Sequence, residues 1–139
     1  QPLSQRIIDG APDAYFASLP VNAMVAAMNQ ADIPSAVSYT AGTYVCNDVM
    51  YQVLHALATR FPETRGTFLH VPFATEQVVE KNAAAAEKNA AGEKDTAGEK
   101  FRPVPSMSLE MMTRGLQVAL EAALANDVDL TDSESGTTC

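Results

Sequence analysis

Hydrophobic residues recur at helical spacing in three stretches of the chain, three or four positions apart, which places them on one face of a helix. The first helix is expected from Pro20, with Ser18 as a candidate cap, and it ends before Pro34. The second is expected over residues 43–60, and the third from a Ser106 cap to about residue 125. The predicted buried stripes are Val21, Met24, Val25 and Met28; Cys46, Val49, Met50, Val53 and Leu57; and Leu109, Met112, Leu116, Ala119, Leu120 and Ala123.

Two short strands are expected between these helices. Residues 35–40 alternate weakly, and residues 66–73 are apolar on both faces, as in a strand that helices cover on both sides. Strands that alternate with helices indicate an α/β protein with a three-layer α/β/α arrangement and right-handed crossovers.

Residues 80–100 follow a different pattern. Glu-Lys-Asn recurs at residues 80 and 87, Glu-Lys recurs at 93 and 99, and no apolar residue larger than alanine lies between them. The alanines favour a helix, whereas Gly92 and Gly98 weaken it. We therefore expect a low-complexity, solvated arm inserted into one domain formed by residues 1–79 and 101–126. A partner-binding helix is disfavoured because the arm has no apolar stripe.

Composition narrows the class of protein. The 139 residues are 47% hydrophobic and carry a net charge of −8, which disfavours nucleic acid and anionic membranes as partners. Residues 127–139 are acidic, without Lys or Arg, and are expected to form a disordered tail. No secretory signal or membrane-length apolar run appears, so a cytoplasmic location is expected. The start at Gln1 without Met leads us to expect a fragment or a processed product.

Cys46 and His70 are the candidate catalytic residues. Cys46 stands at the start of the expected second helix, where the helix dipole and first-turn N–H groups favour a thiolate nucleophile. His70 stands near the end of the second expected strand. Each has a structural alternative: Cys46 as a space-filling core thiol, and His70 as a hydrogen-bonded core histidine. His55 and Asp48 follow Cys46 on the same helix but point to other sides of it, so they are weaker candidates for a base.

Two segments resemble the pyroglutamyl peptidase I family, also called pyrrolidone-carboxylate peptidases. Residues 38–47 read S-Y-T-A-G-T-Y-V-C-N against the family's S-x-T-A-G-T-[FY]-V-C-N. Residues 66–73 read G-T-F-L-H-V-P-F, with Thr67 in place of the more usual apolar residue. The similarity extends over most of residues 9–125. It implies an α/β/α fold with a mixed sheet, of which this chain supplies the C-terminal part.

The resemblance also implies a function. Cys46 would attack the carbonyl of an N-terminal pyroglutamyl residue, His70 would act as the base, and Tyr44 and Val45 would lie beside the lactam ring. The alternative for Tyr44 is packing on the sheet. The N–H groups at the helix start, including that of Cys46, would stabilise the oxyanion. The family's third catalytic residue is a Glu in the N-terminal half, which this chain does not contain.

The implied partners are N-terminally pyroglutamylated peptides, with no metal or cofactor needed. The sequence leaves open whether the protein is a homo-oligomer. Two alternatives to the peptidase remain: a catalytically inactive fragment or pseudoenzyme that lacks the acidic residue, and an interaction module that uses the arm and the acidic tail.

Overall fold

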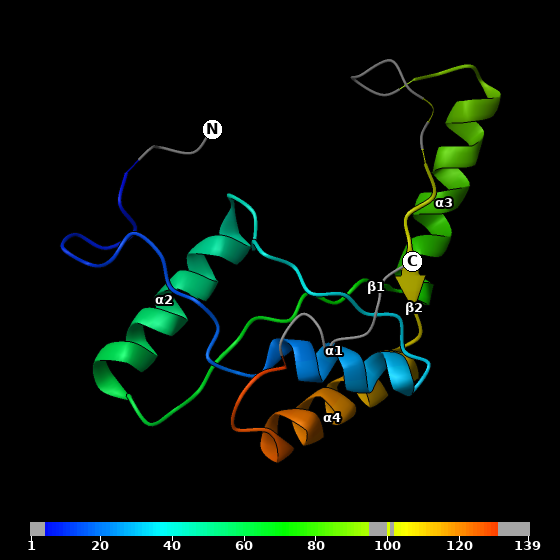
Figure 1. The fold of residues 1–139 in the computed structure, drawn as a ribbon. Coiled ribbons are helices and arrows are strands. Elements are labelled where there is room, and N and C mark those ends of the chain that lie inside the picture. The colour runs from blue at the N-terminus through cyan, green and yellow to red at the C-terminus, as the bar shows by residue number, and fades with distance from the viewer. Residues whose placement is uncertain (1–4, 95–99, 101, 131–139) are drawn as a thin grey trace. The chain divides into compact units, whose positions relative to one another are not determined.

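The computed structural model describes residues 5–94, 100 and 102–130. The chain divides into two compact units: unit 1 combines Gln1–Leu69 with Leu116–Cys139, and unit 2 is His70–Gly115. This division differs from the expected single domain with an inserted arm, because its boundaries fall at residues 69/70 and within the last helix. Figure 1 shows the elements, and each unit is described by itself.

The core of unit 1 lies between α1 (Val21–Gln30) and α4 (Leu109–Ala125), which run side by side in Figure 1. Met24, Met28 and Ile33 are buried against Ala119 and Ala123, whose small side chains allow the helices to approach closely. The stripe expected on α1 is confirmed at Met24 and Met28. The helix ends in a Schellman motif before Pro34, with Asp32 at φ 61° and the Ile33 N–H donating to the Met28 carbonyl at 2.9 Å.

The stripe expected on α4 is only partly correct. Ala119 and Ala123 are buried, but Leu109, Leu116 and Leu120 are 63%, 41% and 57% exposed. The helix turns its alanines toward α1 because the bulky Met24 and Met28 already fill the space between the helices. The leucines therefore lie on a different side of α4 from the contact with α1.

The ends of α1 and α4 are held by side chains from distant segments. The Asp129 carboxylate accepts the Asn22 and Ala23 N–H groups at 2.9 and 3.0 Å, so it caps the start of α1. Ser18, the expected cap, accepts the Gly66 N–H at 2.9 Å instead. At the end of α4, the Arg65 guanidinium donates to the Ala123 and Asn126 carbonyls, both at 3.1 Å. Part of the expected acidic tail, residues 127–130, thus contributes to the fold, while residues 131–139 lie outside the described residues.

The third helix of unit 1 is α2 (Val45–Arg60), close to the expected range of 43–60. Only Leu54 is buried on it, while Val49 and Val53 of the expected stripe are exposed. Gly66 packs so closely against the Leu57 side chain that a Cβ would collide with it. This close approach fixes the segment after α2 against the helix that precedes it.

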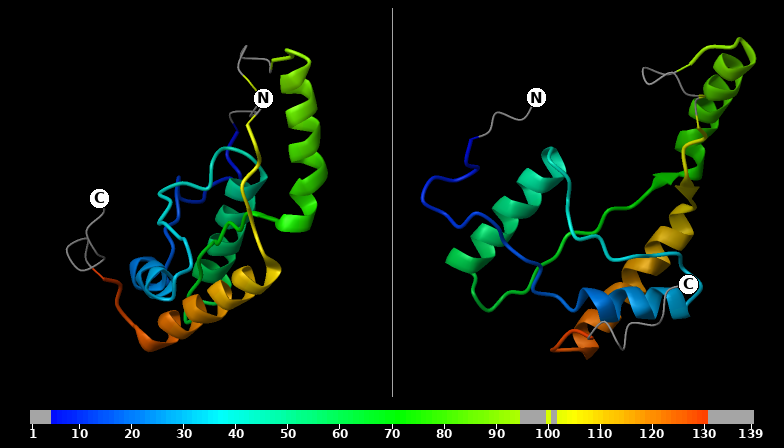
Figure 2. Two further views of the ribbon diagram at one scale, coloured as in Figure 1. Left: turned by 90° about the vertical axis from the view of Figure 1, so that its right-hand side faces the viewer. Right: turned by 45° about the horizontal axis from the view of Figure 1, so that its top comes forward.

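Unit 2 contains β1 (Phe73–Ala74), α3 (Thr75–Ala90) and β2 (Ser106–Met107). The two strands are parallel, with Phe73 opposite Ser106 and Ala74 opposite Met107. Figure 2 shows the chain that leads into β2 lying beside α3. There the Asn82 carboxamide accepts the Val104 N–H at 2.7 Å and donates to the Val104 carbonyl at 3.4 Å. The arm expected at residues 80–100 is therefore helical to Ala90 and is fixed at its base; residues 95–99 lie outside the described residues.

The expected strands are mostly absent from the described structure. Residues 35–40 pair with no strand there, and of residues 66–73 only Phe73 belongs to one. A strand needs a neighbouring strand to satisfy its backbone groups, and apart from the pair β1 and β2 none lies beside these segments within the described ranges. The last helix also begins later than expected: Ser108, rather than Ser106, accepts the Met111 N–H at its start, at 3.2 Å.

Candidate active site

The turn before α2 brings the chain into the helix without a side-chain cap. Gly42 has φ 82°, a conformation that suits glycine, and its N–H donates to the Thr40 hydroxyl at 3.0 Å. The Ser38 hydroxyl in turn donates to the Thr40 carbonyl at 2.8 Å. Tyr44 is the N-cap in an extended conformation, and no side chain caps the helix start. The positive end of α2 is thus presented at the turn.

Cys46 is the second residue of α2 and is half-buried. The helical hydrogen bonds begin with the Asp48 N–H, which donates to the Tyr44 carbonyl at 3.2 Å, and N–H groups of a first turn have no acceptor within their own helix. A helix start of this kind stabilises negative charge, whether on a thiolate or on an oxyanion.

Tyr44 and Val45 precede Cys46 and are 76% and 74% exposed. Tyr44 is thus largely exposed in the described structure. The alternative expected for it, packing on the sheet, stays a prediction. The side chains of Tyr44 and Val45 are both accessible to a ligand next to Cys46 in the sequence. Their role beside a lactam ring stays a prediction.

His70 lies in an exposed position three residues before β1. It begins unit 2, whereas Cys46, Tyr44 and Val45 belong to unit 1. The structure brings together the cysteine and its two neighbours at the start of α2, and describes His70 within the other unit. The pairing of Cys46 with His70 stays a prediction.

His55 and Asp48, the weaker candidates for a base, have other partners. The His55 Nδ1 atom and the Tyr15 hydroxyl are hydrogen-bonded at 2.8 Å, on a side of α2 away from Cys46. The Asp48 carboxylate accepts from the Gln52 side chain at 2.9 Å. Both side chains therefore have structural roles within α2 and its surroundings.

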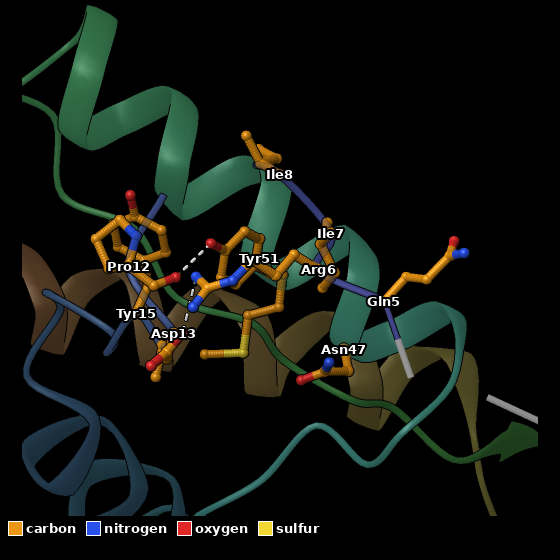
Figure 3. Close-up of a pocket in the computed structure, with 11 residues that line it drawn as sticks. Gln5, Arg6, Ile7, Ile8, Pro12, Asp13, Tyr15, Asn47 and Tyr51 are labelled. Carbon is orange, nitrogen blue, oxygen red and sulfur yellow. Dashed lines mark hydrogen bonds and ion pairs between the residues drawn. The ribbon is translucent and has the colours of Figure 1, made fainter. Parts of the chain in front are cut away.

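A cavity of about 400 Å³ lies between the first turns of α2 and the segment before α1 (Figure 3). The Tyr51 hydroxyl donates to the Pro12 carbonyl at 2.5 Å, and Tyr15 meets Tyr51 edge-on with ring centroids 5.1 Å apart. Partial burial, Tyr15 and Asp13 raise the pKa of the Tyr51 hydroxyl above its usual 10.0, against a lowering effect of Arg6. The cavity is lined by Gln5, Arg6, Ile7, Ile8, Pro12, Asp13, Ala14, Tyr15, Asn47, Met50 and Tyr51.

Sequence reasoning missed this cavity because residues 5–15 are turn-rich and have no hydrophobic period. The one available signal was the similarity to the family, which extends upstream to about residue 9. Within the described part of the chain, no three His, Cys, Asp or Glu side chains are grouped as a metal site would require. No helix in that part is long and apolar enough to cross a membrane.

Comparison with known proteins gives one consistent result. A family model described as pyroglutamyl peptidase matches residues 1–126. Pyrrolidone-carboxylate peptidases of Thermococcus onnurineus and Levilactobacillus brevis are each 43% identical, over 88% and 93% of this chain and 51% and 53% of their own lengths. The chain thus spans about half the length of the curated relatives it matches.

A solved structure agrees with the sequence matches. The crystal structure of pyroglutamyl peptidase I from Bacillus amyloliquefaciens is similar with a TM-score of 0.74 and 32% identity, over 94% of this chain and 52% of that one. The expected α/β fold class is thereby confirmed.

Proposed function

Because this chain belongs to the pyroglutamyl peptidase family, we propose that the full-length protein is a cysteine peptidase that removes N-terminal pyroglutamate from peptides. The observation that carries the proposal is the family match over residues 1–126, which includes a cysteine in the first turn of α2. The substrates would be N-terminally pyroglutamylated peptides, and a cytoplasmic location suits an enzyme that depends on a reduced thiol.

The reaction would begin at Cys46. His70 accepts the proton of the Cys46 thiol, and the thiolate attacks the carbonyl carbon of the pyroglutamyl residue, whose carbonyl oxygen takes the negative charge. The first-turn N–H groups of α2 stabilise this oxyanion. When the tetrahedral intermediate collapses, the C–N bond breaks, the peptide leaves as an amine that takes a proton from His70, and a thioester remains on Cys46.

Water completes the cycle. His70, now neutral, accepts a proton from the water molecule that attacks the thioester carbonyl. The C–S bond breaks, the sulfur takes back the proton from His70, and pyroglutamate leaves with Cys46 restored. Tyr44 and Val45 are exposed next to the nucleophile, which suits them to contact the lactam ring.

The test is release of aminocoumarin from pyroglutamyl-aminocoumarin by the full-length protein, with prolyl-aminocoumarin as the comparison substrate. Proline lacks the ring carbonyl, so a site with hydrogen-bond partners for the lactam would leave them unpaired, and we expect no cleavage of the prolyl compound. Absence of turnover on the pyroglutamyl substrate would refute the proposal.

Substitutions assign the roles. Cys46→Ser and His70→Ala should each remove most of the rate, and the double variant should be little slower, because nucleophile and base act as a unit. His55→Gln is the matched control and should retain most of the rate, since His55 is bonded to Tyr15 on another side of α2. A His70→Ala variant with normal turnover would assign the base elsewhere.

A further inference from the structure

The cavity between residues 5–15 and α2 has walls that fix each other in place. Across the cavity, the Tyr51 hydroxyl on α2 donates a hydrogen bond to the Pro12 carbonyl. Tyr15 packs edge-on against the Tyr51 ring and the His55 imidazole, and its hydroxyl is hydrogen-bonded to His55. Arg6 bonds both the Ala11 carbonyl at 3.1 Å and the Asp13 carboxylate at 2.9 Å. The site is thus preformed within unit 1, as ligand sites usually are (Figure 3).

The cavity adjoins the helix turn that carries the proposed nucleophile. Asn47 follows Cys46 directly, and Met50 lies one turn further, four residues on, so that its side chain neighbours that of Cys46 on the surface of α2. In the tetrahedral intermediate on the Cys46 sulfur, the leaving amine is still bonded to the carbon that the sulfur attacked, so the residue that follows pyroglutamate begins next to this turn of α2. Asn47 and Met50 line the cavity on this turn, which makes them candidates to contact the first residue of the leaving peptide.

The chemistry of the lining selects among side chains. Ile7, Met50 and the rings of Tyr15 and Tyr51 offer apolar surface. The two charged groups, Arg6 and Asp13, are paired with each other and are 56% and 87% exposed, so they lie at the rim and leave no unpaired charge for a ligand. Among the residues drawn in Figure 3, the Asn47 carboxamide has no partner, and it can both donate to and accept from a peptide group.

We propose that this cavity is the subsite for the residue that follows pyroglutamate, and that it favours an uncharged apolar or aromatic side chain there. The inference rests on the proposed peptidase function. Asn47 would bond the backbone of that residue, while Met50, Ile7 and the two tyrosine rings would contact its side chain.

The test compares two substrates with the full-length protein, pyroglutamyl-phenylalanine amide and pyroglutamyl-glycine amide, by the ratio of their kcat/KM values. Met50→Ala and Ile7→Ala should each lower the preference for phenylalanine by about fivefold or more, since they remove apolar contacts made only by that side chain. Val53→Ala is the matched control, because Val53 is an exposed apolar residue of α2 outside the cavity. It should leave the ratio unchanged.

The outcomes separate the two proposals. If the unsubstituted protein releases pyroglutamate from both amides but the cavity variants change the ratio no more than Val53→Ala does, the subsite is wrong and the peptidase stands. If neither amide is cleaved, the peptidase itself is wrong. Ile7 lies in a bend outside the helices and is 39% exposed, so Ile7→Ala should give a folded variant even where Met50→Ala does not. Met50→Leu keeps the volume and should keep the preference.

Discussion

Asp129 makes side-chain contacts in unit 1 with residues more than a hundred positions away in the sequence. Its carboxylate accepts the backbone N–H groups of Asn22 and Ala23 and the Asn22 side-chain amide, across 107 residues of sequence, and it also accepts the Leu130 N–H. A carboxylate at a helix start satisfies otherwise unbonded donors and interacts favourably with the helix dipole. One acidic residue beyond α4 therefore fixes the start of α1 to the end of the described chain.

Replacing this cap should weaken the fold measurably. We expect Asp129→Ala to lower the free energy of unfolding by about 1–2 kcal/mol, the usual effect of losing a helix cap. Asp129→Asn should lower the free energy of unfolding by less, because asparagine also caps helices. Urea denaturation of the full-length protein measures both changes.

Asp127→Ala is the control for this prediction. Asp127 has the same side chain two residues away, but it is almost fully exposed and lies 3.9 Å from Arg65. Its substitution should change the free energy of unfolding by no more than about 0.5 kcal/mol. Equal losses for Asp127→Ala and Asp129→Ala would show that charge, rather than capping, accounts for the effect.

The caps show how far local sequence can predict contacts. Ser18 and Ser106 have the residue type and the position of caps, yet Asp129 and Ser108 take those roles. Ser108 is a shift of two residues, within the usual error of helix boundaries. Asp129 was unpredictable because a cap from 107 residues away leaves no pattern near the helix it serves. Cys46, in contrast, was placed correctly at a helix start, since the Gly42 turn and the apolar spacing are both local.

At the scale of elements, α1, α2 and α4 were predictable, whereas α3 and the strands were not. The ranges of α1 and α2 follow from hydrophobic spacing and proline positions, which act within the helix itself. The segment 66–73 has the composition of a buried strand, but pairing depends on neighbours elsewhere in the fold. Only Phe73 and Ala74 find one within the described residues, in Ser106 and Met107.

One residue of the arm, which was expected to be solvated throughout, makes contacts that hold the fold together. Asn82 belongs to the first Glu-Lys-Asn repeat, and its carboxamide binds Val104 as a neighbouring strand would. Beside it, the Lys81 ammonium lies 4.2 Å from the centre of the Phe73 ring. The base of α3 is therefore part of unit 2, and the replaceable part of the arm begins after Asn82.

We expect a short Gly/Ser linker in place of residues 84–100 to change stability little, because this stretch has no apolar side chain larger than alanine. Asn82→Ala should instead cost about 1–3 kcal/mol, since it leaves two backbone groups of Val104 without their bonds. Denaturant midpoints of the full-length protein compare the two changes.

Glu80→Ala is the control at the base of the arm, where it removes an exposed side chain and should have little effect. If the linker lowers the free energy of unfolding by more than about 2 kcal/mol, the arm packs against the rest of the protein beyond Asn82.

At the scale of the whole molecule, apolar surface is the main feature. Leu116, Leu120 and Leu124 on α4 and Val49 and Val53 on α2 are exposed in unit 1. Hydrophobic spacing predicted Leu116, Leu120, Val49 and Val53 to be buried, which the described structure contradicts, and it did not include Leu124. Spacing shows which face of a helix is apolar but not what covers that face. The chain spans about half of its relatives' length, so these faces are candidates for contact with the family's N-terminal half.

We therefore expect residues 1–139 alone to bind the dye ANS more strongly than the full-length protein and to have little or no peptidase activity. The second expectation follows from the triad logic of such enzymes: without an acidic residue to orient His70, a loss of roughly 10⁴ in rate is typical. Dye fluorescence and pyroglutamyl-aminocoumarin turnover, measured on both proteins side by side, test it.

Near-equal turnover of the two proteins would contradict this expectation. An acid within the 139 residues would then orient His70, with Glu76 and Glu63 as the first to substitute. Low dye binding by residues 1–139 would separately show that the exposed leucines do not form an accessible patch.

The split of unit 1 between the two ends of the chain has a consequence for synthesis on the ribosome. Unit 2 is one continuous segment, whereas α1 must wait for α4 and Asp129, 107 residues after Asn22. At translation rates of about 5–20 residues per second, that delay is roughly 5–20 seconds. During it, the nascent chain carries α1 uncapped, with Met24 and Met28 uncovered, as a surface that chaperones can recognise.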